Sequence, residues 1–343
     1  MAIKVKKGKG ILFEAVPDNG QVGIRVGENG RVHCLFPNRI VLPDDILTKL
    51  RKDTVPFLYP PPKPIEYQGA SWIVNMCADA DEYRNALIGL DQAFGDKLPI
   101  FNHPRAVAMT RRDLSAKLLE GIPNLIVPKC VRFKADANNS FQKTFEAEGF
   151  KYPVLVRPAT SQTGQDLVKI DTPFDWTKVY QTHWYGKHHY MTQFVDYSEN
   201  GEFTKIRISV VGRDVALRSY RKSSSWLIKG MGGSDDEDIN LLLKQHQEFD
   251  GWESAIKVAN DIASRVDLDF FGMDLGVSSS NFYMFEVNAA MSMSEASVID
   301  AEKAKIMHPI YKWINTRLRD LFLHPGAWKC YLGEGKESCG NVL

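Results

Sequence analysis

The stretch Phe270–Met293, FFGMDLGVSSSNFYMFEVNAAMSM, decides the fold assignment of this chain. Two apolar runs, at residues 270–277 and 282–287, flank a turn rich in serine and asparagine. This pattern predicts a β-hairpin with a short loop. Both runs also carry acidic or amide side chains, which a purely structural core hairpin would not require.

Three oxygen-bearing side chains fall on one face of the predicted hairpin. Side chains alternate along a strand, so Glu286 and Asn288 point the same way, and a three-residue loop at 279–281 places Asp274 opposite Glu286. Two close carboxylates repel and raise each other's pKa unless a cation lies between them. Mg²⁺ or Mn²⁺, held by oxygen ligands and phosphate, would suit this face. The alternative is a solvated strand face without a metal.

The Asp-Leu of residues 274–275 and the Phe-Glu-Val-Asn of residues 285–288 resemble the metal-binding hairpin of the ATP-grasp superfamily, near the glutathione synthetase and RimK-like ligases. The resemblance implies an α/β (α+β) ATP-grasp fold, ATP and Mg²⁺ (or Mn²⁺) as cofactors, and Asp274, Glu286 and Asn288 as metal ligands. It also leads us to expect a basic helix, a phosphate-binding loop, a hinge and paired arginines upstream.

Length and composition limit the class of protein. The 343 residues suffice for two or three domains, and the net charge of +1 argues against nucleic acid or a membrane surface as the main partner. The sequence contains no apolar run long enough to span a membrane, and its N-terminus does not resemble a signal peptide. The scattered cysteines indicate reduced thiols in a cytoplasmic protein. They are Cys34, Cys77, Cys130, Cys330 and Cys339.

The pattern along the chain predicts four regions. Residues 1–60 read as a β-rich N-terminal module that serves recognition or self-association into a homo-oligomer. Its end, Val55–Pro64, has five prolines and reads as an extended connector at a domain boundary. Residues 65–128 have a strand–helix–strand pattern, which predicts a parallel α/β pre-ATP-grasp domain. Residues 129–325 form the predicted ATP-grasp domain, and residues 326–343 a loose tail.

The segment FNHPRAVAMTRRDLSAKLLEGIPNLIVP, residues 101–128, resembles the ATP-grasp entry region with its basic helix. Thr110 is the expected N-cap of that helix. The resemblance implies a phosphate-contacting lysine, and the spacing fits Lys117 or the pair Arg111 and Arg112 equally well. A solvated basic helix face is the alternative for Lys117.

The segment YPVLVRPATSQTGQDLVKID, residues 152–171, predicts two strands joined by a loop of small residues. Such loops offer backbone N–H groups to phosphates. The sequence departs from the family in two ways: Arg157 replaces the usual lysine, and a single glycine, Gly164, remains. We therefore expect hydroxyl groups to assist Arg157 at the nucleotide; they belong to Thr160, Ser161 and Thr163.

The strand YMTQFVD, residues 190–196, fits the hinge, where the adenine would contact Gln193, Phe194 and Val195. The next strand pair, residues 203–223, matches the paired arginines with Arg207 and Arg221. Guanidinium groups suit an acyl phosphate or a substrate carboxylate, so these two are the expected catalytic residues. Lys205 stands where relatives have an acid. The alternative is that these arginines form ion pairs with surface acids. Separately, the glycine pair at residues 232–233 resembles a glycine pair that lies near the acceptor substrate in relatives.

Together these elements imply an ATP-dependent ligase. It would form an amide bond through an acyl phosphate and release ADP and phosphate. The expected partners are a small-molecule or peptide carboxylate and an amine. Two alternatives remain: a kinase of the same fold that phosphorylates a hydroxyl, and a catalytically silent nucleotide-binding regulator, which the departures at Arg157 and Lys205 favour.

Overall fold

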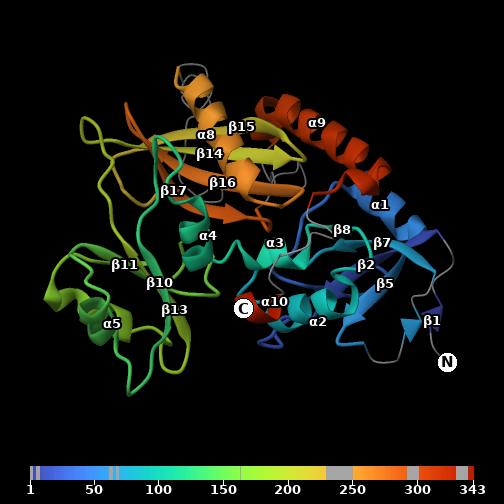
Figure 1. Ribbon diagram of the computed structural model, residues 1–343, viewed down its shortest axis with the longest axis horizontal. Helices are drawn as coiled ribbons and strands as arrows, with labels where there is room; N and C mark the ends of the chain where they lie inside the picture. Colours follow the sequence, from blue (N-terminus) through green and yellow to red (C-terminus); the bar gives the residue numbers. More distant parts are fainter. Residues whose placement is uncertain are drawn as a thin grey trace.

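The chain folds into three main β-sheets with helices packed against them (Figure 1). The coordinates are a computed structural model, which describes residues 3–4, 8–61, 65–66, 69–162, 164–228, 250–291, 301–329 and 339–343. Within these ranges no helix is both long and apolar enough to cross a membrane. The predicted mixed α/β architecture is confirmed.

Four parallel strands form the sheet of the N-terminal unit. In spatial order they are β5 (Thr54–Tyr59), β2 (Lys9–Ala15), β7 (Ala70–Asn75) and β8 (Ile100–Phe101). Parallel neighbours need crossover connections, and helices α1 (Asp44–Asp53) and α2 (Arg84–Phe94) provide two of them. The predicted strand–helix–strand pattern of β7, α2 and β8 is confirmed.

The division of this region into a separate β-rich module and a connector is wrong. Strand β2 pairs with both β5 and β7, so residues on both sides of the proline-rich stretch share one sheet. Strand β5 lies at the sheet edge, where Pro56 is tolerated because an edge strand need not donate all its N–H groups. Deleting residues 1–55 would therefore remove strand β2 from the middle of the sheet.

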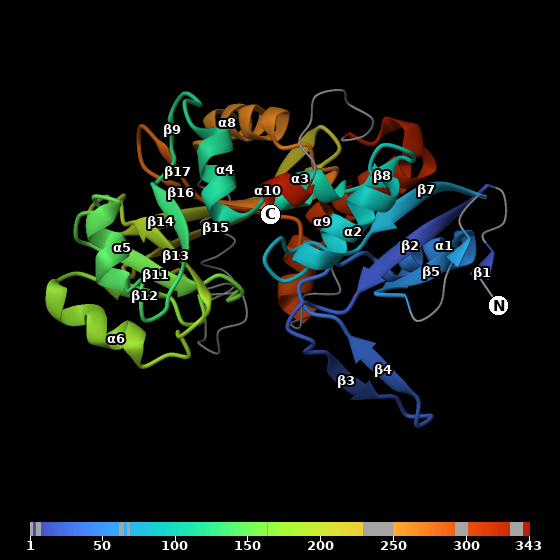
Figure 2. The same cartoon turned by 60° about the horizontal axis from the view of Figure 1, so that its bottom comes forward.

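A two-stranded hairpin projects from the N-terminal unit (Figure 2). It consists of β3 (Gly23–Val26) and β4 (Val32–Leu35). Ile24, Val26 and Val32 are each more than 60 % exposed: 68 %, 65 % and 62 %. The role of this region in recognition or self-association stays a prediction. A further short parallel pair joins β1 (Ile3–Lys4) to β6 (Ile65–Glu66).

The middle sheet is antiparallel and has its own aromatic core. Its strands, in spatial order, are β10 (Cys130–Lys134), β13 (His188–Gln193), β11 (Val154–Pro158) and β12 (Val168–Ile170). Phe133, Phe141 and Trp176 pack in that core. The helical segments here are α5 (Phe141–Ala147), η1 (Pro173–Asp175) and α6 (Trp176–Tyr180).

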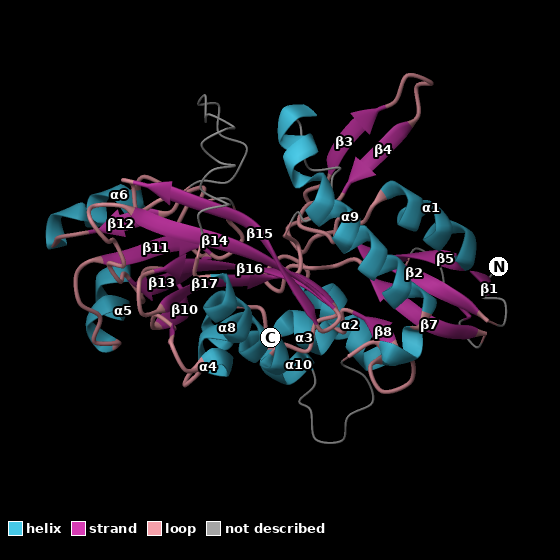
Figure 3. Cartoon of the chain, turned by 90° about the horizontal axis from the view of Figure 1, so that it is seen from above, coloured by secondary structure: helices cyan, strands magenta, loops and turns pink. Residues whose placement is uncertain are grey.

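The third sheet contains the hairpin and has five strands (Figure 3). They are β15 (Asp214–Ser223), β14 (Phe203–Val211), β16 (Phe270–Val277), β17 (Phe282–Asn288) and β9 (Leu125–Ile126). Two amphipathic helices contact this sheet, α8 (Trp252–Arg265) and α9 (Ala301–Leu323).

The predicted pairing of Asp274 with Glu286 is confirmed, although the path to it differs. The loop has four residues, 278–281, and Val277 pairs with Phe282. That register alone would leave Asp274 opposite Phe285. A β-bulge after Asp274 shifts the register by one residue and brings Glu286 opposite it.

The expected loose C-terminal tail is wrong at Trp328. This side chain is 1 % exposed, packs edge-on against Phe101 and Trp72, and donates from Nε1 to the Leu321 carbonyl at 3.0 Å. Burial of an indole contributes a large apolar area to the core, and a buried indole N–H usually finds a hydrogen-bond partner. The short segments η3 (Pro325–Ala327) and α10 (Cys339–Val342) complete the described chain.

Candidate functional site

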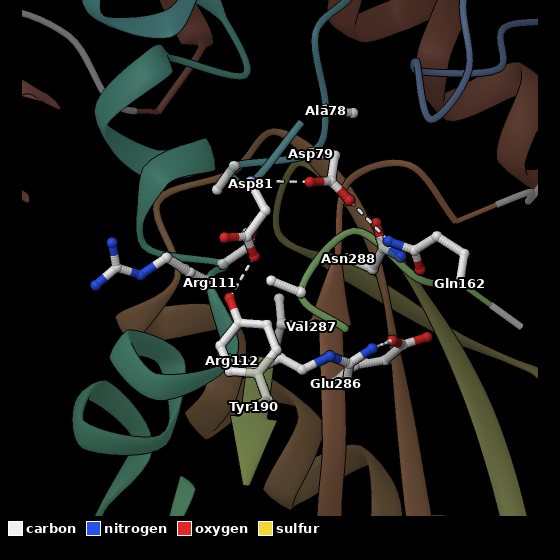
Figure 4. Close-up of a pocket in the computed structure, with 13 residues that line it drawn as sticks. Ala78, Asp79, Asp81, Arg111, Arg112, Gln162, Tyr190, Glu286, Val287 and Asn288 are labelled. Atoms are coloured by element: carbon white, nitrogen blue, oxygen red, sulfur yellow. Dashed lines mark hydrogen bonds and ion pairs between the residues drawn. The ribbon is translucent and has the colours of Figure 1, made fainter. Parts of the chain in front are cut away.

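A pocket lies where the three sheets meet (Figure 4). Its cavity volume is about 30 Å³, which is enough to hold at least one water molecule. The polar residues that line it come from the loop after β7, helix α4, the loop after β11, β13 and β17. They include Asp79, Asp81, Arg111, Arg112, Gln162, Tyr190, Glu286 and Asn288.

Asp274 on β16 is surrounded by cationic side chains. Arg207 on the adjacent strand β14 donates from Nε and Nη2 to its two oxygens, at 2.7 and 2.8 Å. Lys205 Nζ lies 2.6 Å from Oδ2. Burial raises the pKa of Asp274, but the charges of Lys205 and Arg207 outweigh it and hold that pKa well below its usual value. Asp274 is therefore an ionised carboxylate in spite of its burial.

Glu286 on β17 has a cationic partner from another element. The Arg112 guanidinium forms an ion pair with Oε2 of Glu286 and donates to the Phe285 carbonyl at 2.9 Å. Burial raises the pKa of Glu286, but the charge of Arg112 lowers it further, and the net direction is down. The charge of Asp274 raises the pKa of Glu286, as expected of two close carboxylates, but protein cations outweigh this repulsion.

The donor chemistry of the hairpin fits Mg²⁺ or Mn²⁺. Glu286 and Asn288 both line the pocket, and hard divalent cations prefer carboxylate and amide oxygens. Both Asp274 oxygens are engaged by Lys205 and Arg207, so Asp274 could join only if those cations turned to another anion. Across the described ranges, no three His, Cys, Asp or Glu side chains gather as a metal cluster, and the predicted set has two carboxylates.

The basic helix begins one residue later than expected. Helix α4 spans Arg112–Leu119 with Arg111 at its N-cap. Thr110, the predicted cap, instead donates its hydroxyl to the Val107 carbonyl at 2.7 Å, at the end of helix α3 (Pro104–Ala108). Because the helix starts at Arg112, this side chain reaches the pocket from the first turn.

The structure separates the basic candidates of this helix. Arg112 lines the pocket and contacts Glu286. Arg111 also lines it, but its guanidinium donates to Asp113 at 2.8 and 2.9 Å and points away from Glu286 (Figure 4). Lys117 is exposed in the last turn and lies outside the residues that line the pocket.

Arg157 holds the base of the loop after β11, residues 159–167. Its guanidinium donates to the Ser161 carbonyl and, at 3.2 Å, to the Ser161 hydroxyl. Burial and the charge of Arg112 lower its pKa to about 10. Gly164 has a φ of +73°, which favours glycine, and Thr160 is exposed. Thr163 lies outside the described residues.

The hinge candidates lie at the end of β13. The Gln193 amide donates to the carbonyls of Lys151 and Pro153 at 2.8 and 3.0 Å, which fixes the start of β11. Lys169 Nζ lies 4.2 Å from the centre of the Phe194 ring, and Val195 is half-buried. The described residues that line the pocket do not include these three, so their contact with adenine stays a prediction.

The paired arginines share the sheet face with Asp274. Arg221 is buried on β15, and the register places it opposite Lys205, two residues from Arg207 on β14. Arg207 and Arg221 are therefore brought to neighbouring positions, as expected. The glycine pair at residues 232–233 lies outside the described residues.

Sequence reasoning missed the loop of residues 78–83, which follows β7 and contributes Asp79 and Asp81 to the pocket. Burial, with the nearby charge of Asp81, raises the pKa of Asp79 to about 6. A signal was available in the sequence, because the acidic run ADADE follows a buried strand directly. In open parallel sheets, ligands bind beyond the carboxyl ends of the strands.

Comparisons with known proteins place the chain in a family. The sequence model of the RimK-like ATP-grasp domain matches residues 114–310. The VanG D-Ala:D-Ser ligase from Enterococcus faecalis has a similar structure, with a TM-score of 0.51 and 12 % identity over 94 % of this chain and 100 % of that one. This similarity concerns the fold.

Two further solved structures have lower scores. They are D-alanine–D-alanine ligase from Bacillus anthracis (TM-score 0.47, 13 % identity, 91 % of this chain and 98 % of that one) and carboxyaminoimidazole ribonucleotide synthase from Aspergillus clavatus (0.45, 9 %, 82 % and 70 %). The search of curated proteins found no match.

Proposed function

The chain belongs to the RimK-like ATP-grasp family, and from this premise we propose that it is an ATP-dependent ligase that joins a carboxylate to an amine. The substrate carboxylate attacks the γ-phosphate of ATP, ADP leaves, and an acyl phosphate forms. The amine then attacks the acyl carbon, phosphate leaves, and an amide bond remains. The substrates are a small-molecule or peptide carboxylate and an amine.

The observation that carries this proposal is the excess of cations around the hairpin. Lys205 and Arg207 contact Asp274, and Arg112 contacts Glu286. Arg157 is also close enough for its charge to lower the pKa of Glu286. Four cations therefore face two carboxylates. This surplus of positive charge suits phosphate groups, which charge-assisted hydrogen bonds hold in place during transfer.

Every predicted site residue except Lys117 has a role in the proposed reaction. Arg207 and Arg221 hold the transferring phosphoryl group or the substrate carboxylate, and Arg112 and Arg157 hold the phosphates with the 159–167 loop. When Lys205 and Arg207 turn from Asp274 to phosphate oxygens, Asp274 can join Glu286 and Asn288 as a ligand of Mg²⁺ or Mn²⁺. The metal ion supplies charge neutralisation at the phosphates. Adenine contacts Gln193, Phe194 and Val195.

Measurement of ADP release tests the reaction class. The protein is incubated with ATP, Mg²⁺ and a panel of carboxylates, each with and without a panel of amines. A ligase of this mechanism releases stoichiometric ADP when both substrates are present and forms an amide that mass spectrometry detects. ADP release with a single hydroxyl compound, which becomes phosphorylated, would indicate a kinase instead.

One observation favours the silent regulator as the second candidate. Lys205 and Arg207 contact both oxygens of Asp274. These ion pairs compete with a metal ion for one of its proposed ligands. Nucleotide binding without ADP release across the panel would support that candidate over the ligase.

We also propose that the protein acts in the cytoplasm without a nucleic-acid or membrane partner. The near-neutral net charge of +1 supports the absence of these two partners, because nucleic acid and anionic membranes attract strongly basic surfaces. The scattered cysteines, without a paired pattern, support the cytoplasm. Electrophoretic mobility shift and vesicle sedimentation assays at low salt should both show no binding. A shift or co-sedimentation would contradict the proposal.

A further inference from the structure

The 78–83 loop of the N-terminal unit is fastened to the middle sheet at two points (Figure 4). Gln162 Nε2, in the 159–167 loop, donates to Asp79 Oδ2 at 2.7 Å. Two residues further on, Asp81 accepts from Arg132 Nε at 2.8 Å and from the Tyr190 hydroxyl. Arg132 and Tyr190 are paired neighbours on β10 and β13. The 78–83 loop therefore contacts both the middle sheet and the 159–167 loop.

The orientation of Asp79 is fixed by its own loop. Its Oδ1 accepts the backbone N–H groups of Asp81 and Glu82, both at 2.9 Å, and this directs Oδ2 toward Gln162. The side chain is only 8 % exposed, and these three hydrogen-bond donors are uncharged. Burial of a carboxylate with uncharged partners costs stability, and such groups are more common at functional sites than elsewhere.

The 159–167 loop is thereby held at two places. Arg157 binds Ser161 near its base, within the same sheet, and Asp79 binds Gln162 from a different unit of the protein. Asp79 and Gln162 line the same pocket as Arg112, Glu286 and Asn288. The contact between Asp79 and Gln162 therefore forms part of the wall of this pocket (Figure 4).

We propose that Asp79 is a positioning residue that holds the 159–167 loop over the phosphate end of the nucleotide through Gln162. This inference rests on the proposed function and adds a role for the N-terminal unit in it. Asp81, through Arg132 and Tyr190, fixes the 78–83 loop against the middle sheet. The contact between Asp79 and Gln162 then determines the position of the 159–167 loop relative to that sheet. Backbone N–H groups of that loop then meet the phosphates without further adjustment.

A donor–acceptor exchange between the two residues tests the proposal. Gln162→Glu places a second carboxylate against Asp79 and should open the loop. The double variant Asp79→Asn with Gln162→Glu restores one donor and one acceptor. Its new amide at position 79 can donate to the new carboxylate at position 162, while the amide oxygen still accepts from the backbone of residues 81 and 82. Glu82→Gln is the matched control, since Glu82 accepts from Asn38 within the N-terminal unit at 2.5 Å.

The readout is calorimetric affinity for AMP-PNP with Mg²⁺ and for AMP. Gln162→Glu should bind AMP-PNP about tenfold more weakly, which corresponds to about 1.4 kcal/mol. Its affinity for AMP should stay within twofold of wild type, because AMP lacks the β- and γ-phosphates that the loop would contact. The double variant should recover AMP-PNP affinity to within about threefold of wild type, and Glu82→Gln should not change it. Amide hydrogen exchange in the 159–167 loop should rise in the single variant and fall again in the double.

Three results would overturn the proposal: unchanged AMP-PNP affinity in Gln162→Glu, an equal loss of AMP affinity, or failure of the double variant to recover although its melting temperature matches wild type. Failure of the wild-type protein to bind AMP-PNP at all would instead overturn the proposed function. The two failures are therefore distinguishable.

Discussion

Two buried carboxylates near the pocket, Asp274 of the hairpin and Asp79 of the 78–83 loop, differ in their surroundings. Asp274 has the charges of Lys205 and Arg207 beside it, which hold its pKa well below the usual value. Asp79 has uncharged donors and a nearby acid, Asp81, and its pKa rises to about 6. Burial alone therefore does not set the role of an acid. In our proposal, Asp274 belongs to a charged site whose cations exchange the carboxylate for phosphate, whereas Asp79 contacts uncharged partners and positions a loop.

The largest expected difference between the two regions is in turnover. Asp274→Asn or Glu286→Gln removes a charge while keeping the shape of the side chain, and ADP release should fall by about a hundredfold or more, because phosphate charge is then poorly neutralised. Asp79→Asn should lose less than about tenfold. The measurement uses the acid and amine pair that supports wild-type turnover, with Glu82→Gln as the control. Equal losses at Asp79 and Asp274 would contradict the comparison.

Stability should change in opposite directions at the two sites. Asp274→Asn leaves Lys205 and Arg207 without their buried partner and should lower the unfolding free energy by about 3 kcal/mol. Asp79→Asn removes a buried charge without a cation and should be neutral or stabilising by about 1 kcal/mol at pH 7.5. Urea denaturation of both variants decides this. A stabilised Asp274→Asn variant would show that the ion pairs do not neutralise the hairpin.

The pH dependence of stability should differ in sign as well. The pKa of Asp79 in the folded protein, about 6, lies above the ordinary carboxyl value of 3.8, so the folded state binds the proton more tightly. Its contribution to the unfolding free energy therefore falls as pH rises between about 4 and 6, by up to about 3 kcal/mol. Asp274 has a lowered pKa, so its contribution is present above the ordinary value and is lost as pH falls below it.

Urea denaturation at pH 4.5 and 7 measures this effect. The stability of Asp79→Asn relative to wild type should rise with pH, whereas that of Asp274→Asn should not. Asp269 also has a pKa raised to about 6, by burial, but it is present in all three proteins and its effect cancels. A constant difference between Asp79→Asn and wild type would argue that Asp79 keeps an ordinary pKa.

The smallest effect is expected on helix α4. Lys117→Gln should change AMP-PNP affinity by less than twofold, because Lys117 is exposed and outside the pocket lining. Arg112→Gln should weaken AMP-PNP affinity by about tenfold, and Arg157→Ala should weaken it by more than twofold. The reason is that charge-assisted hydrogen bonds to phosphate are among the stronger polar contacts. Calorimetry at fixed ionic strength gives the values. A larger loss at Lys117 than at Arg112 would reverse our assignment.

The sequence was sufficient for features that depend on local pattern. The strand–helix–strand pattern of residues 65–128 predicted β7, α2 and β8. Alternation along two strands, with an assumed three-residue loop, placed Asp274 opposite Glu286, and the structure reaches the same pairing through a four-residue loop and a bulge. The bulge that sets the hairpin register was not predictable, because it depends on packing of the whole sheet. The interpretation of the stretch around Pro56 as a connector failed for a similar reason. A proline is tolerated in an edge strand, but only the sheet order shows that this strand lies at an edge.

The surroundings of the candidate site depend on contacts between distant parts of the chain. Gln162 meets Asp79 across 83 residues, and Arg112 meets Glu286 across 174. Neither contact leaves a pattern in the sequence near either residue. The family resemblance could name Glu286, but it could not show that Arg112 and not Lys117 faces it, because one residue at the start of α4 decides which side chains point into the pocket.

The thermal response to MgATP tests the central claim most directly, namely that the hairpin is the nucleotide and metal site. Melting temperatures are measured for wild type and Glu286→Gln, each with and without MgATP, and with ATP alone to isolate the metal. A ligand that binds only the folded state stabilises it by an amount that grows with the logarithm of the ligand concentration divided by the dissociation constant. The account predicts that MgATP raises the wild-type melting temperature by several degrees and that of Glu286→Gln by little. Equal gains in the two proteins would contradict it.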